Sequence, residues 1–425
     1  MTESANLANR KLLLLDNTWK TLDDGMDSVN RSIALEFKKY KNVEIFCTIL
    51  LHKDNELSSE DLEDAKSNEV TLVYSENYQA SFPDYNFMTE AFNQDPFPFI
   101  PSVWKGIQGI THIVAHWPYT ANAGFIIRDI VFPDAKVILV LHVIPDDLLW
   151  MEEDLPFNFS QDDMLQAAET ADYVFSFTQK VFNNFTAIFR NHASKRINHK
   201  LLIPEGHNEL FGLKQKTLDP NDVPTILCLT YGNEGYKHEG LDIAACAINK
   251  TAELLQNTRP FAVRLVIGVY GEIASTTALK KMVKTYIKNS FVMVEYHHYD
   301  NLKHLMTDLE SCALVLFPTR CEPFGSPLIH ILSAGVPTLM SKNCGVSTRL
   351  RKLVSYGSDF LVPVSNNETA VKQDASIWRE RIIQTLADID TARENALHLQ
   401  RTLRRDEGSK ATLDSITALV LGEIK

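Results

Sequence analysis

The sequence lacks several features that would assign it to a simple class. Its six cysteines include no C-x-x-C pair, so we expect no metal site, and their scattered use is typical of a reducing compartment. No window has the length and apolarity of a membrane span, and the first residues contain no apolar run of signal-peptide length. Positive charge is not in excess, because the formal net charge is −12 at pH 7. We therefore expect a cytoplasmic protein with no membrane span, no nucleic-acid partner and no metal cofactor.

Short apolar runs that alternate with amphipathic segments make up most of the 425 residues. This alternation predicts the α/β fold class with parallel sheets. We expect strands at 11–16, 43–51, 70–74, 110–116, 136–142, 171–177, 200–204, 225–231, 263–269, 291–295, 313–318, 337–341 and 359–362. We expect helices at 28–40, 121–131, 240–255 and 302–310, and a mostly helical segment from 377 onward.

Aspartate, asparagine and proline cluster at 215–224 and predict a linker there. The linker separates an N-terminal domain, 1–214, from a C-terminal domain, 225–376, and we expect helices in 377–425 to cross back to the N-terminal domain. Ligands of open parallel sheets bind beyond the carboxyl ends of the strands. We therefore expect a small-molecule ligand in a cleft between the two domains.

The stretch R-C-E-P-F-G-S-P-L-I-H-I-L-S-A-G-V-P, residues 320–337, reads as a ligand loop. A predicted strand ends at Pro318, a tight loop contains Pro323 and Gly325, and a helix is expected from about Ser326. Backbone N–H groups at a helix start can bind an anion. Glu322, just before the loop, can accept hydrogen bonds from sugar hydroxyls. The alternative is an ordinary strand–loop–helix turn with an exposed glutamate.

This stretch resembles the signature of retaining, nucleotide-sugar-dependent glycosyltransferases with the GT-B fold, family 4. That signature has an acid, then F-G, a second acid eight positions after the first, and then A-x-G-x-P. The matching residues are Glu322, Phe324, Gly325, Ala334, Gly335, Pro337 and, after the next strand, Gly345. The resemblance covers nearly the whole chain. It implies two Rossmann-like domains facing a central cleft, with the acceptor side in the N-terminal domain and the donor side in the C-terminal domain.

The resemblance also assigns roles in the N-terminal half. Gly25 matches the glycine loop that lies against the donor phosphates, although Asp24 replaces its partner glycine. His142 matches the strand-terminal histidine that faces the donor sugar, and it joins Glu322 as a catalytic residue. His116 and Trp117 correspond to the acceptor side, where a structural role is the alternative reading. The long segment 75–101 is expected to help shape that side.

The match fails at the diphosphate clamp. The family has an arginine and a lysine where this chain has Asn233 and Glu239. Such cations offset the diphosphate charge through charge-assisted hydrogen bonds. Lys237 and His238 lie close by and could substitute if the loop shifts. The positions around them that match the family are Gly232, Gly240 and Asp242.

Two further changes fall on the nucleotide end of the ligand. His330 replaces the second acid, which contacts the ribose in the family, and a histidine is not a bidentate acceptor. Pro327 removes one backbone N–H near the phosphates. The resemblance gives a donor-binding set that consists of Gly25, Asn233, Lys237, Glu239, Phe324, Gly325, Ser326 and His330.

Two main hypotheses remain open from the sequence. The first is a glycosyltransferase that moves a sugar from a nucleoside diphosphate donor with retention, or from a sugar phosphate in a variant of that chemistry. The second is a catalytically inactive relative that binds a sugar, another small ligand or a protein partner. Two-domain epimerases and binding proteins are a less specific match. Free cations in the cleft, such as Lys237, Arg320 or Lys342, would favour the first hypothesis.

Overall fold

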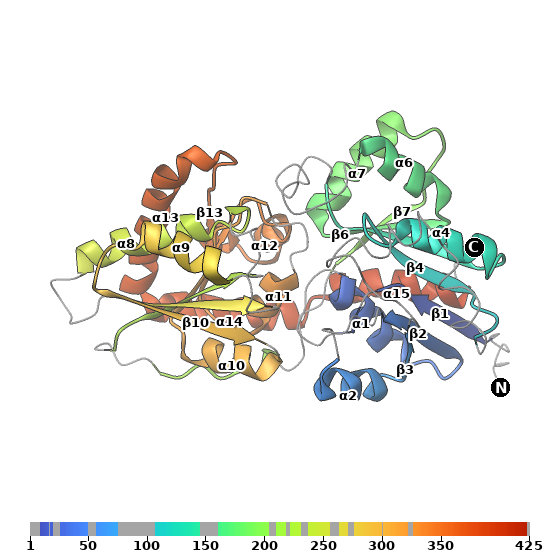
Figure 1. Ribbon diagram of the computed structural model, residues 1–425, viewed down its shortest axis with the longest axis horizontal. Coiled ribbons are helices and arrows are strands. Elements are labelled where there is room, and N and C mark those ends of the chain that lie inside the picture. Colours follow the sequence, from blue (N-terminus) through green and yellow to red (C-terminus); the bar gives the residue numbers. More distant parts are fainter. Residues whose placement is uncertain are drawn as a thin grey trace. The chain divides into compact units, whose positions relative to one another are not determined.

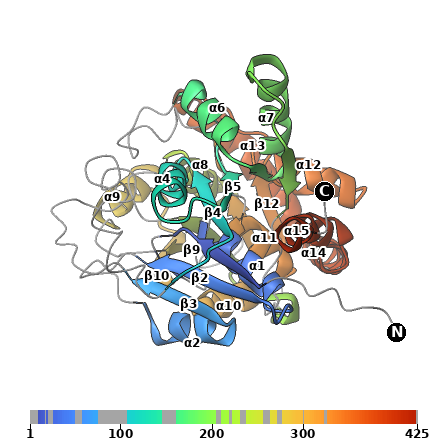
Figure 2. The same cartoon turned by 90° about the vertical axis from the view of Figure 1, so that its right-hand side faces the viewer.

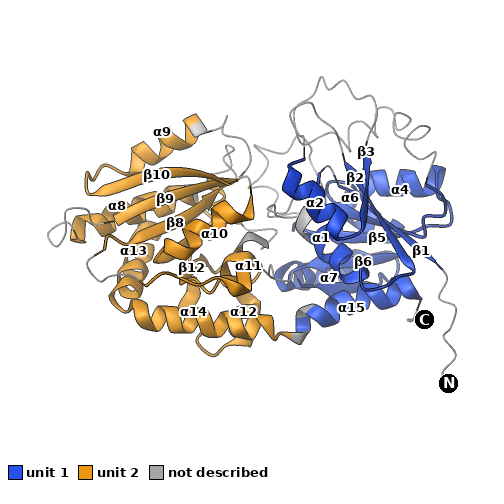
Figure 3. Ribbon diagram, turned by 90° about the horizontal axis from the view of Figure 1, so that it is seen from below, with its two compact units in different colours: residues 1–205, 407–425 blue, residues 206–406 orange. Residues whose placement is uncertain are grey.

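The computed structural model divides the chain into two compact units, residues 1–205 with 407–425 and residues 206–406 (Figure 3). The structure describes residues 9–16, 18–19, 26–49, 57–74, 107–144, 160–203, 210–217, 222–230, 237–255, 263–270, 276–299, 301–321 and 326–422.

Unit 1 is built on one parallel sheet, with the strand order β3-β2-β1-β4-β5-β6-β7 (Figure 1). Its strands are β1 (Arg10–Leu14), β2 (Val43–Ile49), β3 (Val70–Tyr74), β4 (His112–Trp117), β5 (Lys136–Leu141), β6 (Tyr173–Phe177) and β7 (His199–Leu202). The central strands read as continuous apolar runs because helices cover both faces of a parallel sheet. All six residues of β4 are buried, and so are the last five of β5.

The helices of unit 1 are α1 (Met26–Phe37), α2 (Ser59–Ser67), α4 (Ala121–Ile130), α6 (Gln161–Thr170), α7 (Gln179–His192) and α15 (Glu407–Leu421). Helix α2 packs against β3 at that edge of the sheet (Figure 2). Capping boxes of Ser58 with Asp61 and of Ser160 with Asp163 start α2 and α6. Helix α15 contacts α1 and β7, and Thr412 accepts a hydrogen bond from the Ile203 N–H at 3.1 Å. The chain end is thus part of the first unit.

Unit 2 repeats the parallel design, with the strand order β10-β9-β8-β11-β12-β13. Its strands are β8 (Thr225–Thr230), β9 (Val263–Tyr270), β10 (Val292–Tyr299), β11 (Leu314–Phe317), β12 (Thr338–Ser341) and β13 (Leu361–Val362). Its helices are α8 (Leu241–Leu255), α9 (Thr276–Tyr286), α10 (Leu302–Ser311), α11 (Ser326–Ser333), α12 (Ser347–Leu353), α13 (Val371–Ala387) and α14 (Ile389–Arg404). Short 3₁₀ turns lie at Leu210–Gly212, Gly357–Phe360 and Glu368–Ala370.

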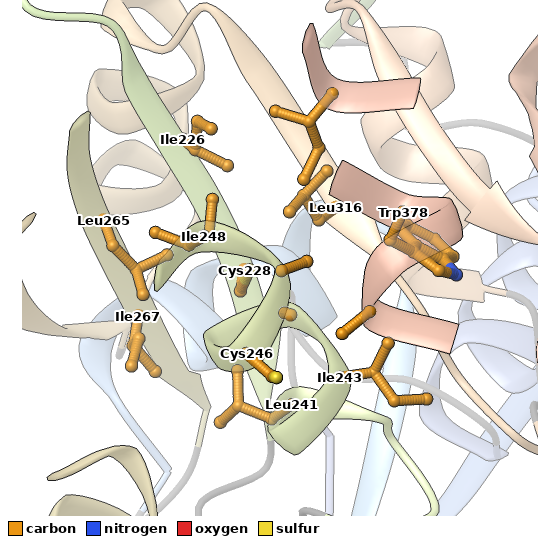
Figure 4. Packing of buried hydrophobic residues seen from close by; sticks show 14 of the residues in the cluster. Ile226, Cys228, Leu241, Ile243, Cys246, Ile248, Leu265, Ile267, Leu316 and Trp378 are labelled. Atoms are coloured by element: carbon orange, nitrogen blue, oxygen red, sulfur yellow. The ribbon is translucent and has the colours of Figure 1, made fainter. Parts of the chain in front are cut away.

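The core of unit 2 lies between the sheet and helices α8 and α13 (Figure 4). Trp378 on α13 is fully buried there, and its indole N–H donates to the Pro363 carbonyl at 3.2 Å. Cys228 and Cys246 belong to the same cluster and have free thiols. Both cysteines therefore act as small apolar side chains of the core.

Each sheet has one position where the strand order reverses, between β1 and β4 in unit 1 and between β8 and β11 in unit 2. Crossovers leave the sheet in opposite directions at such a switch point, and in open parallel sheets ligands bind beyond the carboxyl ends of the strands there. The ends of β1 and β4, and those of β8 and β11, are therefore the candidate ligand positions.

The expected strands are confirmed to within a few residues, apart from the last. The expected strand at 359–362 is wrong over its first half, because residues 357–360 form a 3₁₀ turn and only Leu361 and Val362 pair with β12. Phe360 is buried in that turn, which explains why it read as part of a buried strand. The expected long segment at 75–101 lies outside the described residues.

Candidate functional site

At the switch point of unit 1, His116, the second-last residue of β4, meets His142, which directly follows β5. His116 Nδ1 and His142 Nε2 are 2.8 Å apart, which is a hydrogen-bond distance. The ring of His142 also lies 5.4 Å from the ring of Phe177 at the end of β6. Parallel pairing of β4 with β5 aligns the two strand ends, so adjacent strands bring both side chains to one edge of the sheet.

Asn30 and Asp16 extend this pair into a buried polar chain. Asn30 on α1 has its Oδ1 3.0 Å from His116 Nε2, and its Nδ2 donates to Asp16 Oδ2 at 2.8 Å. Asp16 follows β1, and its backbone N–H donates to Thr48 Oγ1 at 2.9 Å. The chain therefore joins the ends of β1, β2, β4 and β5 through hydrogen bonds rather than apolar packing.

Burial makes this chain electrically neutral at its histidine end. His116 and His142 are both 0% exposed. Burial lowers the pKa of His142 to about 3. Burial and the adjacent His142 hold the pKa of His116 well below its ordinary value. Removing an imidazolium from water disfavours the charged form, so both rings are neutral imidazoles near pH 7.

Trp117, the last residue of β4, is also buried, at 3% exposed. Its ring lies edge-on to the ring of Phe185 on α7, with 6.5 Å between centroids. The structure thus brings His116 and His142 into direct contact, and it packs Trp117 against the helix beyond them. Gly25, the remaining unit 1 residue of the predicted site, lies outside the described residues.

At the switch point of unit 2, the turn of residues 237–240 is fastened to the segment that follows β11. The carbonyl of His238 accepts hydrogen bonds from the Arg320 N–H at 2.7 Å and from Thr319 Oγ1 at 3.0 Å. Gly240 closes the turn at φ +72°, and a Cβ added there would lie 1.9 Å from the Pro318 carbonyl oxygen. Only glycine fits, because the conformation is left-handed and the neighbouring backbone is too close.

The Arg320 side chain bonds to both the turn and the start of α8 at this junction. Its Nη1 and Nη2 donate to Asp242 Oδ1 and Oδ2 at 2.9 and 3.0 Å, a bidentate pair near the start of α8. Nη1 also donates to the Lys237 carbonyl. The arginine side chain is 0% exposed and the aspartate 6% exposed. Arg320 therefore holds the turn in place and is not a surface cation.

The turn at this junction carries one position of the family's diphosphate clamp, and ionisable side chains lie on either side of it in the sequence. Glu239, at the lysine position of the family, accepts a hydrogen bond from Thr230 Oγ1 at the end of β8. His238 is neutral at pH 7, because burial and the nearby Arg320 lower its pKa to about 4. Lys237 is half-buried, and Lys342, after β12, is exposed. Asn233, at the arginine position, lies outside the described residues.

Helix α11 begins at Ser326 and carries His330, which is buried at 8% exposed. The same helix places Leu328 and Ile331 in the interior. Glu322, Phe324 and Gly325 lie outside the described residues, so their predicted roles stay predictions. Among the residues that the structure describes, no group of three or more His, Cys, Asp or Glu could hold a metal ion.

None of the helices in the described parts of the chain combines the length and the apolarity that a membrane-crossing segment needs. A comparison with curated proteins gives no match. A model of the family described as family 4 glycosyltransferases in conflict systems matches residues 13–414. The chain belongs to this family. The resemblance read from the signature at 320–337 is confirmed at the level of the family.

Solved structures support the same fold for this family 4 member. A sucrose-phosphate synthase from Thermosynechococcus elongatus has a TM-score of 0.70 at 15% identity, covering 96% of this chain and 98% of that one. HepE from Anabaena, described as in complex with UDP and glucose, has a TM-score of 0.60 at 15% identity, covering 98% of this chain and 100% of that one. WaaG, a glycosyltransferase involved in lipopolysaccharide biosynthesis, has a TM-score of 0.60 at 11% identity, covering 96% and 99%. The expected GT-B architecture of two parallel-sheet α/β domains is confirmed.

Sequence reasoning missed the residues that hold this family 4 protein's two switch points in shape. Asp242 appeared only as a match to the family, and Arg320 only as a possible free cation, although together they form a buried pair. Asn30 stood in a predicted helix with nothing to mark it, and Asp16 ended a predicted strand. A polar residue directly after an apolar strand was the one available signal for Asp16.

Proposed function

We propose that this protein is a glycosyltransferase that takes a sugar from a nucleoside diphosphate donor and transfers it with retention of configuration. Membership of a glycosyltransferase family over residues 13–414 supports the reaction class. The observation that carries the proposal is the rigid turn at the ends of β8 and β11. There, a buried Arg320–Asp242 pair and a left-handed Gly240 keep a glycine-bearing turn at the edge of the sheet.

The proposed roles follow from the chemistry that a departing diphosphate requires. Backbone N–H groups at the start of α11 and the ammonium of Lys237 would offset the charge that develops on the leaving group. Glu322 and His142 would contact the donor sugar, and Phe324, Gly325, Ser326 and His330 would line the nucleotide. Unit 2 would bind the donor, and unit 1 would bind the acceptor near His116 and Trp117. Metal is not part of this proposal.

One observation favours the alternative of an inactive relative that binds a ligand or protein. The Nη1 and Nη2 atoms of Arg320 both donate to Asp242 and its side chain is buried, so it adds no cation for a diphosphate. The lysine position holds Glu239, an acid that would repel the same group. A protein with this clamp could bind a neutral sugar or a less charged donor and carry out no transfer from a nucleotide.

A thermal-shift series with UDP, GDP, ADP and their sugar conjugates separates the two functions. A ligand at a hundred times its Kd stabilises the folded state by about 2.7 kcal/mol, which gives a clear rise in Tm. A rise with one nucleotide and its conjugate supports the transferase. No rise with any nucleotide at millimolar concentration, combined with a rise with a free sugar, supports the alternative.

Replacing the proposed catalytic acid tests the transferase directly. Glu322→Ala is expected to abolish nucleotide release from the donor identified in the thermal-shift series, with little change in Tm. Glu380→Ala, in an exposed position of α13, is the matched control and should retain full release. Unchanged release by Glu322→Ala would remove this residue from the proposed mechanism.

A further inference from the structure

In the hydrogen-bonded chain at the switch point of unit 1, each donor and each acceptor can be assigned. Asn30 Nδ2 lies 2.8 Å from Asp16 Oδ2 and 3.3 Å from the carbonyl oxygen of Leu15. A backbone carbonyl can only accept, so the NH₂ group of Asn30 must face it. This orientation holds whichever protonation state Asp16 has. The other end of the amide, Oδ1, therefore faces His116 as an acceptor.

The orientation of the Asn30 amide in turn decides which ring nitrogen of His116 donates and which accepts. Its Nε2 lies 3.0 Å from Asn30 Oδ1, which accepts only, so Nε2 must carry the proton. His116 is a neutral imidazole because burial and His142 lower its pKa, so it has one ring proton. Its Nδ1 is then a lone-pair acceptor. The backbone N–H of His116 is held separately, by Thr120 Oγ1 at 2.8 Å.

The same argument shows which ring nitrogen of His142 carries the proton. Its Nε2 lies 2.8 Å from the acceptor Nδ1 of His116, so Nε2 must donate and carry the proton. We propose that Asn30 and His116 are positioning residues that hold His142 as the Nε2–H tautomer, with Nδ1 as a hydrogen-bond acceptor. The backbone carbonyl of Leu15 thus decides the proton position of a ring two side chains away.

This assignment limits what His142 can recognise, a step that depends on the proposed function. An unprotonated Nδ1 accepts a hydrogen bond from a sugar hydroxyl and cannot donate one to a phosphate oxygen. A buried neutral ring also supplies no positive charge for a diphosphate. The switch point of unit 1 therefore selects the hydroxyl-bearing sugar portion of a ligand over its phosphates.

Nitrogen NMR on the full chain, labelled with ¹⁵N only in histidine, tests the tautomer. The His142 signals are assigned by their loss in His142→Gln. We expect a protonated Nε2 and an unprotonated Nδ1 that stay unchanged from pH 8 to pH 5. A proton on Nδ1 of His142 in the wild-type protein, or rapid exchange between both nitrogens, would overturn the proposal.

Two matched variants then test the relay. Asn30→Leu has similar volume and removes both the acceptor of His116 Nε2–H and the donor to Asp16, so we expect His142 to populate both tautomers. Thr120→Val removes a buried hydrogen bond to the backbone of His116 and leaves its ring bonds intact, so the wild-type tautomer should persist. Equal behaviour of the two variants would contradict the relay.

The ligand contact is tested on the same samples with UDP-glucose and UDP as probes. We expect UDP-glucose to shift the unprotonated nitrogen signal of His142 and UDP to leave it in place. The Kd of UDP divided by the Kd of UDP-glucose should fall by about fivefold in Asn30→Leu, which is the effect of losing one neutral hydrogen bond. The same ratio should stay constant in Thr120→Val. A wild-type tautomer as described, with binding of neither probe, would reject the proposed donor while keeping the relay. Binding of UDP-glucose without a shift at His142 would reject the contact.

Discussion

At the scale of single residues, Arg320 is the clearest case: the sequence offered it as a free cation for the ligand, but the structure buries it in an ion pair with Asp242. The side chains of Arg320 and Asp242 are both buried, and the two guanidinium bonds satisfy both carboxylate oxygens. Burying two ions is unfavourable unless the geometry is good and the other polar atoms are satisfied. The Lys237 carbonyl provides an additional acceptor. The pair therefore specifies the shape of the turn more than it adds stability.

Removing the carboxylate of the Arg320–Asp242 pair should lower the stability of the protein. Asp242→Ala leaves a buried guanidinium without its carboxylate, and we expect the free energy of unfolding to fall by about 3–5 kcal/mol. Urea unfolding followed by tryptophan fluorescence measures the loss. Glu380→Ala, which breaks the exposed Arg379–Glu380 pair, is the control and should change the value by about 0.5 kcal/mol or less. A similar small effect in both variants would mean that Arg320 finds another partner.

Charge restoration is a second prediction at residue scale. Asn233→Arg combined with Glu239→Lys returns both cations of the family clamp, and Glu239→Lys alone changes the local charge by two units. We expect the double variant to bind nucleoside diphosphates at least about tenfold more tightly, since each charge-assisted hydrogen bond contributes about 1.5–3 kcal/mol.

Isothermal titration with UDP and GDP measures this effect. Lys303→Arg, an exposed position on α10, controls for nonspecific effects of substitution without changing the net charge. Equal affinity of the double variant and the wild type would mean that the turn does not contact the diphosphate.

At the scale of elements, strand ends and their following turns form the two candidate ligand positions. The turn of residues 237–240 leads directly into α8, and it is hydrogen-bonded to the segment after β11. Strands β8 and β11 are neighbours in the sheet but far apart in sequence. A single glycine with positive φ makes this junction compatible with both strands.

Gly240→Ala should therefore disrupt the junction. The new Cβ would lie 1.9 Å from the Pro318 carbonyl oxygen, and the residue would keep a left-handed φ of +72°. We expect a loss of at least about 2 kcal/mol in the free energy of unfolding. Gly212→Ala is the matched control in the same unit, because a Cβ there has no atom within 4 Å. The two are compared by urea unfolding, and equal effects would contradict the steric argument.

Sequence periodicity predicted the elements well because parallel strands are apolar on both faces. The strand predicted at 70–74 matches β3 residue for residue, and the one predicted at 136–142 is one residue longer than β5. Positions at the candidate site were harder to predict. Asn30 is polar at a buried helix position, and only the fold places His116 beside it. Such residues break the local pattern because they satisfy each other across strands.

At the scale of the whole molecule, buried histidines are unevenly shared between the two units. The pKa values of His112 and His199 in unit 1 are lowered to about 4, mainly by burial, and that of His142 to about 3. His116 is lowered as well. In unit 2, burial and the nearby Arg320 lower the pKa of His238 to about 4, and His330 is buried as well.

This distribution predicts that acid weakens unit 1 more than unit 2. A folded pKa below the unfolded value of about 6.5 means that the unfolded chain binds more protons, so stability is fully present above that pH and is lost as pH falls toward 4. Each such histidine contributes a slope of up to about 1.4 kcal/mol per pH unit. Ordinary carboxylates add little between pH 6.5 and 5.

Hydrogen exchange read by mass spectrometry, corrected for the intrinsic pH dependence of exchange, compares the units in one sample. We expect protection of β4 and β5 to fall more steeply from pH 6.5 to 5 than protection of β8 and β9. His112→Gln should reduce the slope in unit 1 and leave unit 2 unchanged. Equal slopes in both units would contradict the assignment of neutral buried histidines.

The sequence by itself determined the α/β class, most element boundaries and the family, because strand periodicity and the signature at residues 320–337 are local patterns. The tertiary structure alone decided what the polar residues do. Arg320 faces Asp242, across 78 positions of sequence, and His116 lies between Asn30 and His142. Hydrogen-bond partners distant in sequence are set by strand order and helix placement, and a linear pattern of residue types does not encode them.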